Sequence, residues 1–308
     1  MYGPRKTPVL PSSSIGSNAY SWLLEGVAPA TPHFAGHPGG KLVGGILSKA
    51  AGVEYGVAEA TPSIRCYHPP MDDYARRLRA KFLTRIGRQY QTVSQTLRFG
   101  PLSLLFTRIA DPNRVLDEVA DAEDRHERLT GERKSSDHLH LPYWAELWDS
   151  AHAIAHWLAN QPPLAGVRVL DLGCGMGLSG TVAAALGATV LFADLEPAAL
   201  LFAQLNSAPH RPRIRARRLD WRSDQLNETF DLILGADILY ERKQWDYLNP
   251  FWQLHLAPQG KILLGEPGRQ TGDLFLPWIR QYNWNLSEQH FNIPAPPKRI
   301  RLLTLQRP

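Results

Sequence analysis

Five residues between two apolar runs have the types and spacing of a ligand-binding turn. Asp171, Gly173, Gly175 and Gly177 form a D-x-G-x-G-x-G segment at the end of one run, and Asp194 ends the next. Glycine allows a sharp turn and lets the backbone approach a ligand where a Cβ would collide. Asp194 stands about 20 residues beyond the first glycine, where an acid accepts hydrogen bonds from ribose hydroxyls. The segment therefore predicts a strand–turn–helix–strand unit that binds a nucleotide-type ligand.

The spacing also separates one class of nucleotide ligand from another. A dinucleotide fingerprint reads G-x-G-x-x-G, but Leu178 stands where its third glycine would be. The carboxylate of Asp171 would repel a pyrophosphate and suits a ligand that carries an ammonium group. S-adenosylmethionine (SAM) has an ammonium group, a ribose and no phosphate, so we predict a SAM site. The alternative is an ordinary βαβ turn whose glycines serve packing.

Two side chains after the third predicted strand are expected beside the same turn. Asp220 and Trp221 follow the run 213–219. Ligands of open α/β sheets bind beyond the carboxyl ends of the strands. Asp220 is expected to accept a hydrogen bond from an adenine amino group while Trp221 packs against the ring. A helix cap or a surface turn is the alternative for Asp220.

The segment after the fourth predicted strand is expected to present the methyl acceptor. The buried run 230–236 ends at Ala236 and leads to Asp237 and Tyr240. Methyl transfer from a sulfonium is an in-line displacement that needs an unprotonated nucleophile and the exclusion of water. A lysine amine, with a pKa of about 10.4, must first lose a proton. Asp237 is expected to orient such an amine and Tyr240 to bond or enclose it; otherwise Asp237 caps a helix that begins near Lys243.

The elements that must position these residues alternate along the second half of the chain. Strands are predicted at 167–172, 188–193, 213–219, 230–236 and 260–265, and helices at 178–186, 197–206, 244–256 and 274–282. Two alternating segments, 284–291 and 300–305, flank a proline-rich loop at 294–297. The pattern predicts an α/β fold with a doubly wound, seven-stranded, mostly parallel sheet and an antiparallel C-terminal hairpin.

An aromatic segment, 141–158, precedes the first of these strands and reads LPYWAELWDSAHAIAHWL. Helical periodicity is clear from Trp148 onward. Tyr143, Trp144 and Trp148 are expected either to pack against the cofactor and attract a sulfonium cation, or to serve the core, as we expect of Trp157. Two histidines, His152 and His156, have a metal-ligand spacing, but no acid or cysteine completes a ligand set, so a surface position is expected.

Residues 71–140 predict an N-terminal helix and hairpin extension. An apolar stripe lies at i, i+4 spacing and basic residues crowd the other faces, which favours a helix docked on its own domain over one that binds a membrane or an acidic polymer. The stripe consists of Tyr74, Leu78, Phe82, Ile86 and Tyr90. The runs 91–99 and 102–109, joined by Gly-Pro, predict a hairpin. A helix from Pro112 and a polar loop at 131–137 follow.

The first 70 residues and the overall composition bound the class of protein. Residues 1–70 are rich in Pro, Gly, Ser and Ala, so we expect a disordered or weakly ordered extension, with Met71 as a possible start of translation. The formal charge of +5 does not demand nucleic acid. Two distant cysteines, Cys66 and Cys174, indicate neither a disulfide framework nor a metal site, and a reducing, cytoplasmic location is expected. No apolar run approaches a membrane span.

Four segments, LPYWAELWDSA, LDLGCGMGL, LDW and GADILYE, resemble in this order the family-16, seven-β-strand protein methyltransferases with their Rossmann-like fold. That group includes protein-lysine methyltransferases and bacterial relatives labelled nicotinamide N-methyltransferase-like. The resemblance covers residues 141–308, which are expected to form the SAM-dependent methyltransferase domain. It implies that Asp237 and Tyr240 shape the acceptor site. It also implies contact with SAM by Trp148, Gly173, Gly175, Asp194, Trp221 and Ala236.

The resemblance implies methyl transfer to nitrogen, with a lysine side chain of a protein as the expected acceptor. A small-molecule N-methyltransferase is the nearest alternative. A nucleic-acid base methyltransferase is less favoured, because Asp237-Ile238-Leu239-Tyr240 replaces the N/D-P-P-Y segment of that class. A SAM-binding scaffold without turnover is the alternative from a different class of protein.

Overall fold

The computed structural model describes residues 71–131, 141–294 and 297–308. The extension expected at 1–70, with Cys66, and most of the polar loop expected at 131–137 lie outside these residues. The described chain begins with helix α2 (Asp73–Ile86), the strands β1 (Thr92–Phe99) and β2 (Leu102–Ile109), and helix α3 (Pro112–Thr130). A single 3-10 turn, η1 (Tyr143–Ala145), then leads to helix α4 (Asp149–Ala159).

A seven-stranded sheet forms the centre of the remaining chain, in the order β5-β4-β3-β6-β7-β9-β8. The strands from β5 to β7 are parallel, whereas β9 is antiparallel to both β7 and β8. The predicted mostly parallel sheet with an antiparallel C-terminal hairpin is therefore confirmed. Its strands are β3 (Arg168–Leu172), β4 (Thr189–Asp194), β5 (Ile214–Arg218), β6 (Phe230–Ala236), β7 (Leu256–Glu266), β8 (Asn285–Pro294) and β9 (Pro297–Gln306).

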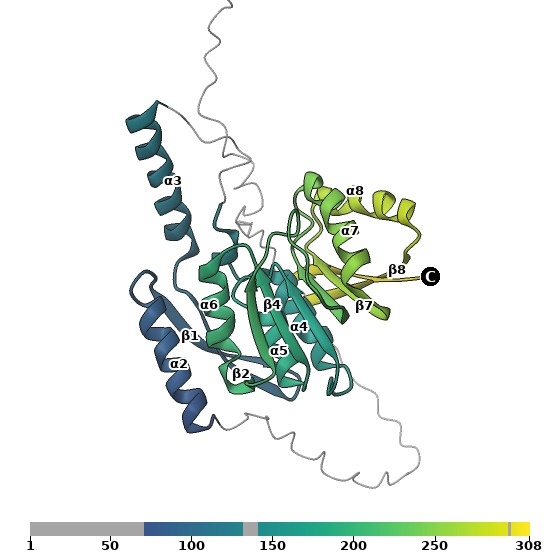
Figure 1. The fold of residues 1–308 in the computed structure, drawn as a ribbon, viewed down its shortest axis with the longest axis horizontal. Helices are drawn as coiled ribbons and strands as arrows, with labels where there is room; N and C mark the ends of the chain where they lie inside the picture. The colour runs from purple at the N-terminus through teal and green to yellow at the C-terminus, as the bar shows by residue number, and fades with distance from the viewer. Residues whose placement is uncertain (1–70, 132–140, 295–296) are drawn as a thin grey trace, which may run out of the picture. The chain divides into compact units, whose positions relative to one another are not determined.

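Helices cover both faces of this sheet, because side chains of one strand point alternately to the two sides. Val190 and Phe192 of β4 join one apolar cluster, while Leu191 and Ala193 join the other. The first cluster includes α4, α5 (Leu178–Ala185) and α6 (Pro197–Asn206). The second includes α7 (Trp245–His255) and α8 (Gln270–Ile279), which lie on the opposite face (Figure 1).

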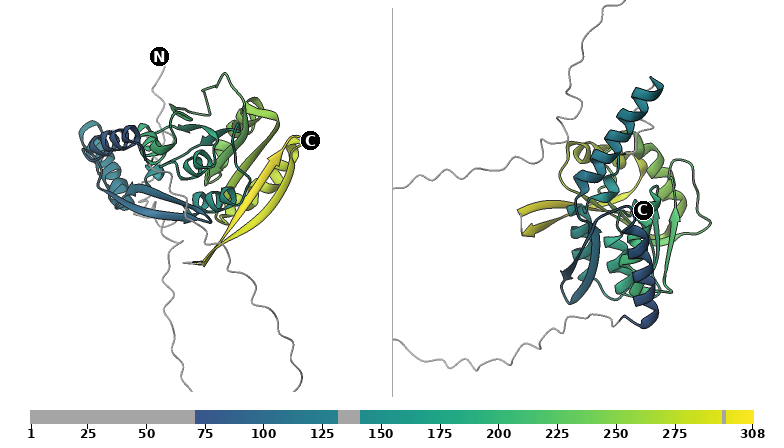
Figure 2. Two further views of the ribbon diagram at one scale, coloured as in Figure 1. Left: turned by 90° about the horizontal axis from the view of Figure 1, so that it is seen from below. Right: turned by 90° about the vertical axis from the view of Figure 1, so that its left-hand side faces the viewer.

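The N-terminal helix and hairpin pack against α4 and α6 (Figure 2). The strands β1 and β2 pair antiparallel, with Phe99 opposite Leu102, as the sequence predicted. The docked position of α2 was also predicted, and Ile86 and Phe82 of its apolar stripe pack on the core, but two positions differ from the prediction. Tyr74 of the expected apolar stripe is 58% exposed, while Arg79 is buried. The Arg79 guanidinium donates to the Leu205 carbonyl (3.3 Å), so a polar contact replaces an apolar one.

A buried amide joins the hairpin to the rest of the fold. Asn206, the last residue of α6, accepts from the backbone N–H of Thr107 (2.8 Å) and donates to the Thr107 carbonyl (3.0 Å). Its Nδ2 also donates to the carbonyl of Met176 in the glycine-rich turn (3.0 Å). One side chain thus connects β2, α6 and the turn.

The two histidines of α4, expected at the surface, are only partly exposed. The ring of His156 stacks on Phe291 of β8 (centroids 4.9 Å apart) and meets Phe99 of β1 edge-on (4.8 Å). His152 lies against the same Phe99 ring (6.1 Å). Both imidazoles are half-buried between two hairpins, and burial lowers the pKa of each. Across the described ranges, no group of three metal-ligating side chains gathers.

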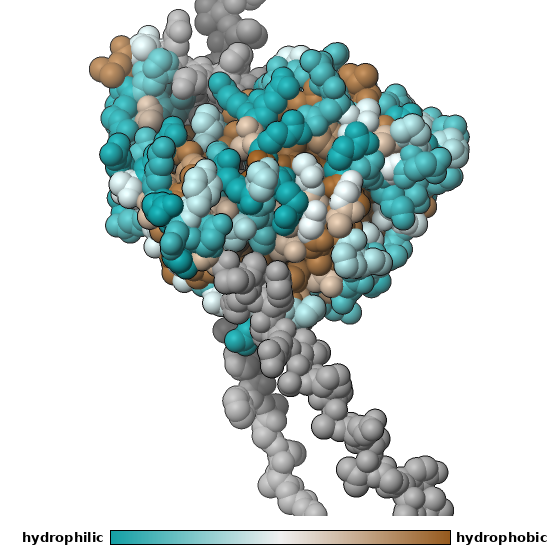
Figure 3. Space-filling model, turned by 60° about the horizontal axis from the view of Figure 1, so that its bottom comes forward, coloured by the Kyte–Doolittle hydropathy of each residue, from teal (hydrophilic) through white to brown (hydrophobic). Residues whose placement is uncertain are grey.

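The face of the molecule drawn in Figure 3 mixes hydrophilic side chains with smaller apolar areas. In residues 71–131, 141–294 and 297–308, no helix combines the length and the apolar character that crossing a bilayer requires.

Candidate functional site

The glycine turn connects β3 to α5 at the carboxyl edge of the sheet. Gly173, Gly175 and Gly177 have φ values of +63°, +51° and +81°, a left-handed backbone that favours glycine. A Cβ on Gly177 would lie 2.7 Å from Ala203 of α6, and one on Gly173 would lie 2.9 Å from Ile238 Cγ2. The turn is therefore packed closely against α6 on one side and against the segment after β6 on the other.

Asp194, at the end of β4, lies beside the glycine turn and forms a hydrogen bond with it. Its Oδ2 accepts from the backbone N–H of Gly175 (2.8 Å) and its Oδ1 from that of Glu196 (2.9 Å). Each carboxylate oxygen has two lone pairs, so both retain capacity to accept from ribose hydroxyls. Burial raises the pKa of Asp194 to about 6, because few water molecules solvate the ionised form.

Asp171, the acid of the D-x-G-x-G-x-G segment, lies beneath the turn. Its Oδ2 accepts from the backbone N–H of Gly180 in α5 (2.8 Å), and burial raises its pKa to about 7. This bond fixes the first turns of the helix to the strand. The expected attraction of an ammonium group by Asp171 stays a prediction.

The third strand end contributes an indole beside the turn. A Cβ on Gly173 would lie 3.5 Å from the Trp221 ring, and the Trp221 indole N–H donates to Gln244 Oε1 (3.0 Å). The Asp220 carboxylate accepts from the backbone N–H of Arg222 (3.0 Å) and pairs with its guanidinium (2.7 Å). Asp220 thus forms the surface turn that the sequence left open, and its contact with an adenine stays a prediction.

Asp237 follows β6 on the other side of the turn and has a strained backbone. Its φ of +56° is left-handed, and its N–H donates to the Gly265 carbonyl (2.9 Å), beyond Ala236 at the end of β6. The buried carboxylate accepts two hydrogen bonds from Arg269, from Nε to Oδ1 and from Nη2 to Oδ2, both 3.2 Å long. Its side-chain partner is therefore an arginine on another element, and the alternative of a helix cap near residue 243 is wrong.

Aromatic side chains lie beside this ion pair, whose arginine is 42% exposed. The Trp148 indole N–H donates to the Tyr143 carbonyl (2.9 Å), and the Arg269 guanidinium carbon lies 5.3 Å from the Trp148 ring centre. The rings of Tyr143 and Tyr240 meet edge-on with centroids 5.4 Å apart. Burial raises the pKa of Tyr240 to about 12. The structure therefore brings together Trp148, Asp237 and Tyr240, which the sequence had assigned to one site.

Trp144, which the sequence left between cofactor and core, has its side chain in the core. Its ring packs against Tyr90 (5.4 Å) and Phe202 (5.9 Å). Its backbone carbonyl lies 3.5 Å from the position that a Cβ on Gly175 would take.

Sequence reasoning missed Glu266 and Arg269, which lie beside Asp237 on the acceptor side of the site. Arg269 precedes α8, and its backbone N–H, together with that of Gly268 (2.9 Å), donates to Glu266 Oε1. Arg301 Nε donates to the other oxygen of Glu266 (3.0 Å). The available signal was the segment Glu266-Pro-Gly-Arg269 at the carboxyl end of a predicted strand, where the other site residues were sought.

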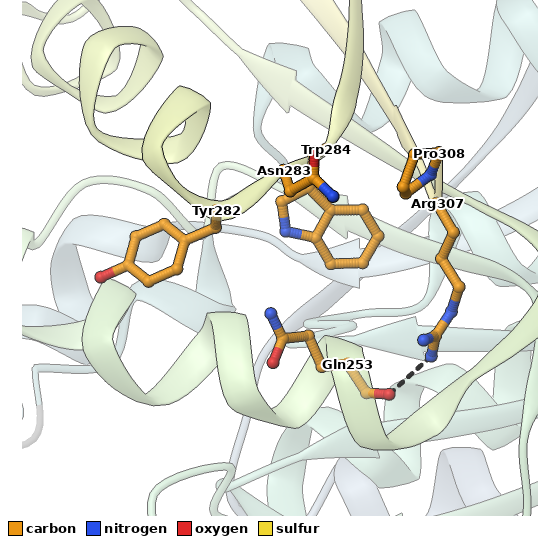
Figure 4. A pocket seen from close by; sticks show the side chains of 6 residues that line it. All are labelled: Gln253, Tyr282, Asn283, Trp284, Arg307 and Pro308. Carbon is orange, nitrogen blue, oxygen red and sulfur yellow. Dashed lines mark hydrogen bonds between the residues drawn. The ribbon is translucent and has the colours of Figure 1, made fainter.

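A separate hollow of about 300 Å³ lies at the opposite edge of the sheet (Figure 4). Arg307 donates to the carbonyls of Gln253 (2.6 Å) and Leu256 (3.1 Å), so its guanidinium closes the end of α7. The lining residues are Gln253, Tyr282, Asn283, Trp284, Arg307 and Pro308.

Comparisons with known proteins identify the family of this chain. A family model described as lysine methyltransferase matches residues 143–277. The electron transfer flavoprotein beta subunit lysine methyltransferase of Danio rerio is 35% identical over 135 residues, which are 42% of this chain and 51% of that protein. Protein N-lysine methyltransferase METTL21A of Danio rerio is 38% identical over 171 residues, 52% of this chain and 77% of that protein.

A solved structure, the TehB-like SAM-dependent methyltransferase of Corynebacterium glutamicum, superposes with a TM-score of 0.42 at 21% identity, covering 64% of this chain and 100% of that one. The chain spans about half the length of the flavoprotein-directed relative. It covers more than two thirds of the METTL21A relative. On that match the chain belongs to the lysine methyltransferase family.

Proposed function

We propose that this protein is a SAM-dependent methyltransferase that methylates a lysine side chain of a protein. The observation that carries the proposal is the buried Asp237 carboxylate, whose partner Arg269 lies against the Trp148 ring, on the segment that also packs against the glycine turn through Ile238. The segment after β6 therefore contacts both the acceptor site and the glycine turn expected to bind the cofactor. The names of the relatives, which specify lysine as the acceptor, support the same conclusion.

The residues of the turn fit SAM. The turn offers left-handed glycines in place of side chains, and the two oxygens of Asp194 retain lone pairs for ribose hydroxyls. Trp221 lies beside Gly173 and offers a flat ring. When bound, SAM supplies a methyl group on a positively charged sulfur, so neither a metal nor a covalent enzyme intermediate is required of the protein.

The chain's own groups then act on the acceptor. Asp237 accepts a hydrogen bond from an acceptor N–H, which directs the nitrogen lone pair away from the carboxylate. Tyr143, Trp148 and Tyr240 place ring surface beside the amine, which limits its contact with water. Holding the reactants in a fixed orientation is the main source of rate for such a displacement.

The experiment is transfer of radiolabelled methyl from SAM into a cell lysate. Wild type is compared with Asp237→Asn and Gly175→Arg, and with Asp246→Asn as a control on an exposed acid of α7. Discrete protein bands that are labelled by wild type and by the control but not by the two site variants are the expected result. Acid hydrolysis of these bands should release methylated lysine.

Two results would overturn the proposal. Label confined to small molecules would make the protein a metabolite N-methyltransferase. Absence of label in every fraction, although calorimetry detects SAM binding, would make it a SAM-binding scaffold.

A further inference from the structure

A cation already stands beside the acid of the acceptor site. Arg269 donates two hydrogen bonds to Asp237, each 3.2 Å long, and its guanidinium carbon lies 5.3 Å from the Trp148 ring centre. A carboxylate and an aromatic face that both contact one cation also form the environment that binds an alkylammonium ion. The guanidinium therefore occupies the position in which a protonated lysine would bind most tightly.

The position of Arg269 is fixed from behind. Glu266, which is buried, accepts from the backbone N–H groups of Gly268 and Arg269, and Arg301 pairs with Glu266 at 2.9 Å. A Cβ on Gly272 would lie 2.2 Å from the Glu266 carboxyl carbon, so α8 closes over this acid. The Asp237 side chain is 5% exposed, whereas that of Arg269 is 42% exposed. The arginine thus faces the solvent and the carboxylate faces inward.

We propose that Arg269 is a specificity-determining residue: it neutralises Asp237 and takes the place of an ammonium ion, so that the acceptor amine binds uncharged. The inference deepens the proposed function and rests on it, because it concerns how that reaction selects the form of its acceptor.

The chemistry of the acceptor requires such a selection. A protonated amine has no lone pair with which to attack the methyl carbon. The lysine amine in solution has a pKa of about 10.4 and is therefore protonated at neutral pH. An unpaired carboxylate within a few ångströms would raise that pKa and hold the unreactive form. With Arg269 in place, the Asp237–Arg269 pair has no net charge and does not attract an ammonium ion. The N–H bond of the ammonium breaks before binding, and its proton goes to solvent.

The paired carboxylate can still orient the neutral amine. Each oxygen of Asp237 accepts one hydrogen bond from Arg269 and keeps a second lone pair for an acceptor N–H. The charged and titratable groups that act on this region from the surrounding elements are Asp149 of α4, which pairs with Lys298 of β9, Asp194 of β4, Tyr143, Tyr240, Glu241, Glu266 and Arg269. Arg269 alone among these forms hydrogen bonds with the Asp237 side chain.

The test uses n-butylammonium chloride as a probe, because its head group is that of a lysine side chain. Ligand-observed NMR measures its affinity for the full chain at pH 7.5. Arg269→Gln should bind the probe more than about fivefold more tightly than wild type, since the carboxylate is freed. Arg269→Lys should resemble wild type. The double variant Asp237→Asn/Arg269→Gln should lose the gain.

Arg242→Gln is the matched control. Arg242 also lies over indole rings, 4.8 Å from Trp245 and 5.4 Å from Trp278, and pairs with an acid, Asp246, at 3.7 Å. It does not bond with Asp237, so its loss should leave the affinity for the probe unchanged. Equal affinity in wild type and Arg269→Gln, or an equal gain in Arg242→Gln, would overturn the proposal.

The labelled protein acceptor supplies a second readout. In Arg269→Gln the pKa that limits kcat should rise by about one to three units. At pH 7.5 both kcat and KM should fall, and Arg269→Lys should restore the wild-type profile. An unchanged profile would contradict the inference. If wild type labels no protein, the proposed function fails, while the amine titration still decides the role of Arg269.

Discussion

The bond network of Asn206 allows a quantitative test of how the glycine turn is held. Replacement of Asn206 by alanine removes three hydrogen bonds at once, two to the backbone of Thr107 and one to the Met176 carbonyl. The side chain is 3% exposed, so water cannot readily replace the amide. Three backbone groups would therefore lose their partner inside the fold.

The expected cost follows from those three groups. Leaving a buried backbone donor or acceptor unpaired costs about 1–3 kcal/mol, and the lower part of that range gives about 3–5 kcal/mol for Asn206→Ala. Asn249 is also 3% exposed and lies in α7, but within the described residues its side chain accepts a single hydrogen bond, from the Trp284 indole N–H (2.9 Å). Asn249→Ala should therefore cost about 1–2 kcal/mol.

The assay is urea unfolding of the full chain, followed by tryptophan fluorescence, with the free energy of unfolding extrapolated to water. Calorimetry with SAM is done on both variants. Because Met176 belongs to the turn, Asn206→Ala should also weaken SAM binding, whereas Asn249→Ala should not. A loss of stability no larger in Asn206→Ala than in Asn249→Ala would refute the reasoning.

Three further predictions concern the turn and its acids. Gly177→Ala places a Cβ 2.7 Å from Ala203 on a backbone with φ of +81°, so SAM affinity measured by calorimetry should fall by about tenfold or more. The control is Gly100→Ala, where a Cβ meets nothing within 4 Å and SAM affinity should not change. Similar losses of affinity in the two variants would contradict this prediction. Since the pKa of Asp194 is about 6, its carboxylate is ionised above that pH, and SAM affinity should fall as the pH drops through 6; a matching fall in Asp194→Asn would exclude this acid as the cause. With a pKa of about 12, the Tyr240 hydroxyl stays protonated at neutral pH and cannot act as a base. Tyr240→Phe should therefore lower kcat without shifting the pH profile of kcat. A shifted profile would show that Tyr240 takes part in proton transfer.

Local sequence pattern predicted most of the sheet. The boundaries of β6 and α6 agree with the predicted 230–236 and 197–206 at both ends, because a mostly apolar run and a helix that starts at proline are signals within one segment. The predicted helix at 274–282 starts late, since α8 begins at Gln270 among polar residues whose helical state depends on packing. The strand predicted at 260–265 begins earlier, at Leu256.

The candidate site was predicted strand by strand, but its connections were not. Glycine spacing and strand ends located Asp194, Trp221 and Asp237 at one edge of the sheet. Nothing in periodicity could predict that Arg269 would pair with Asp237, because that pair joins residues 32 positions apart on different elements. Arg79 was misplaced for the same reason: the groups that satisfy its guanidinium lie on β2 and α6.

The left-handed backbone of Asp237 has a consequence for how this lineage can vary. At a φ of +56°, asparagine and glycine are tolerated, while branched and bulky side chains are strained. Of the residues one base change away from an aspartate codon, valine, tyrosine and alanine would therefore be opposed by the main chain before their chemistry mattered. Genetic drift at this position is channelled toward asparagine, which keeps the shape and loses the charge, or glycine, which loses both, and either change would leave Arg269 without its counter-ion.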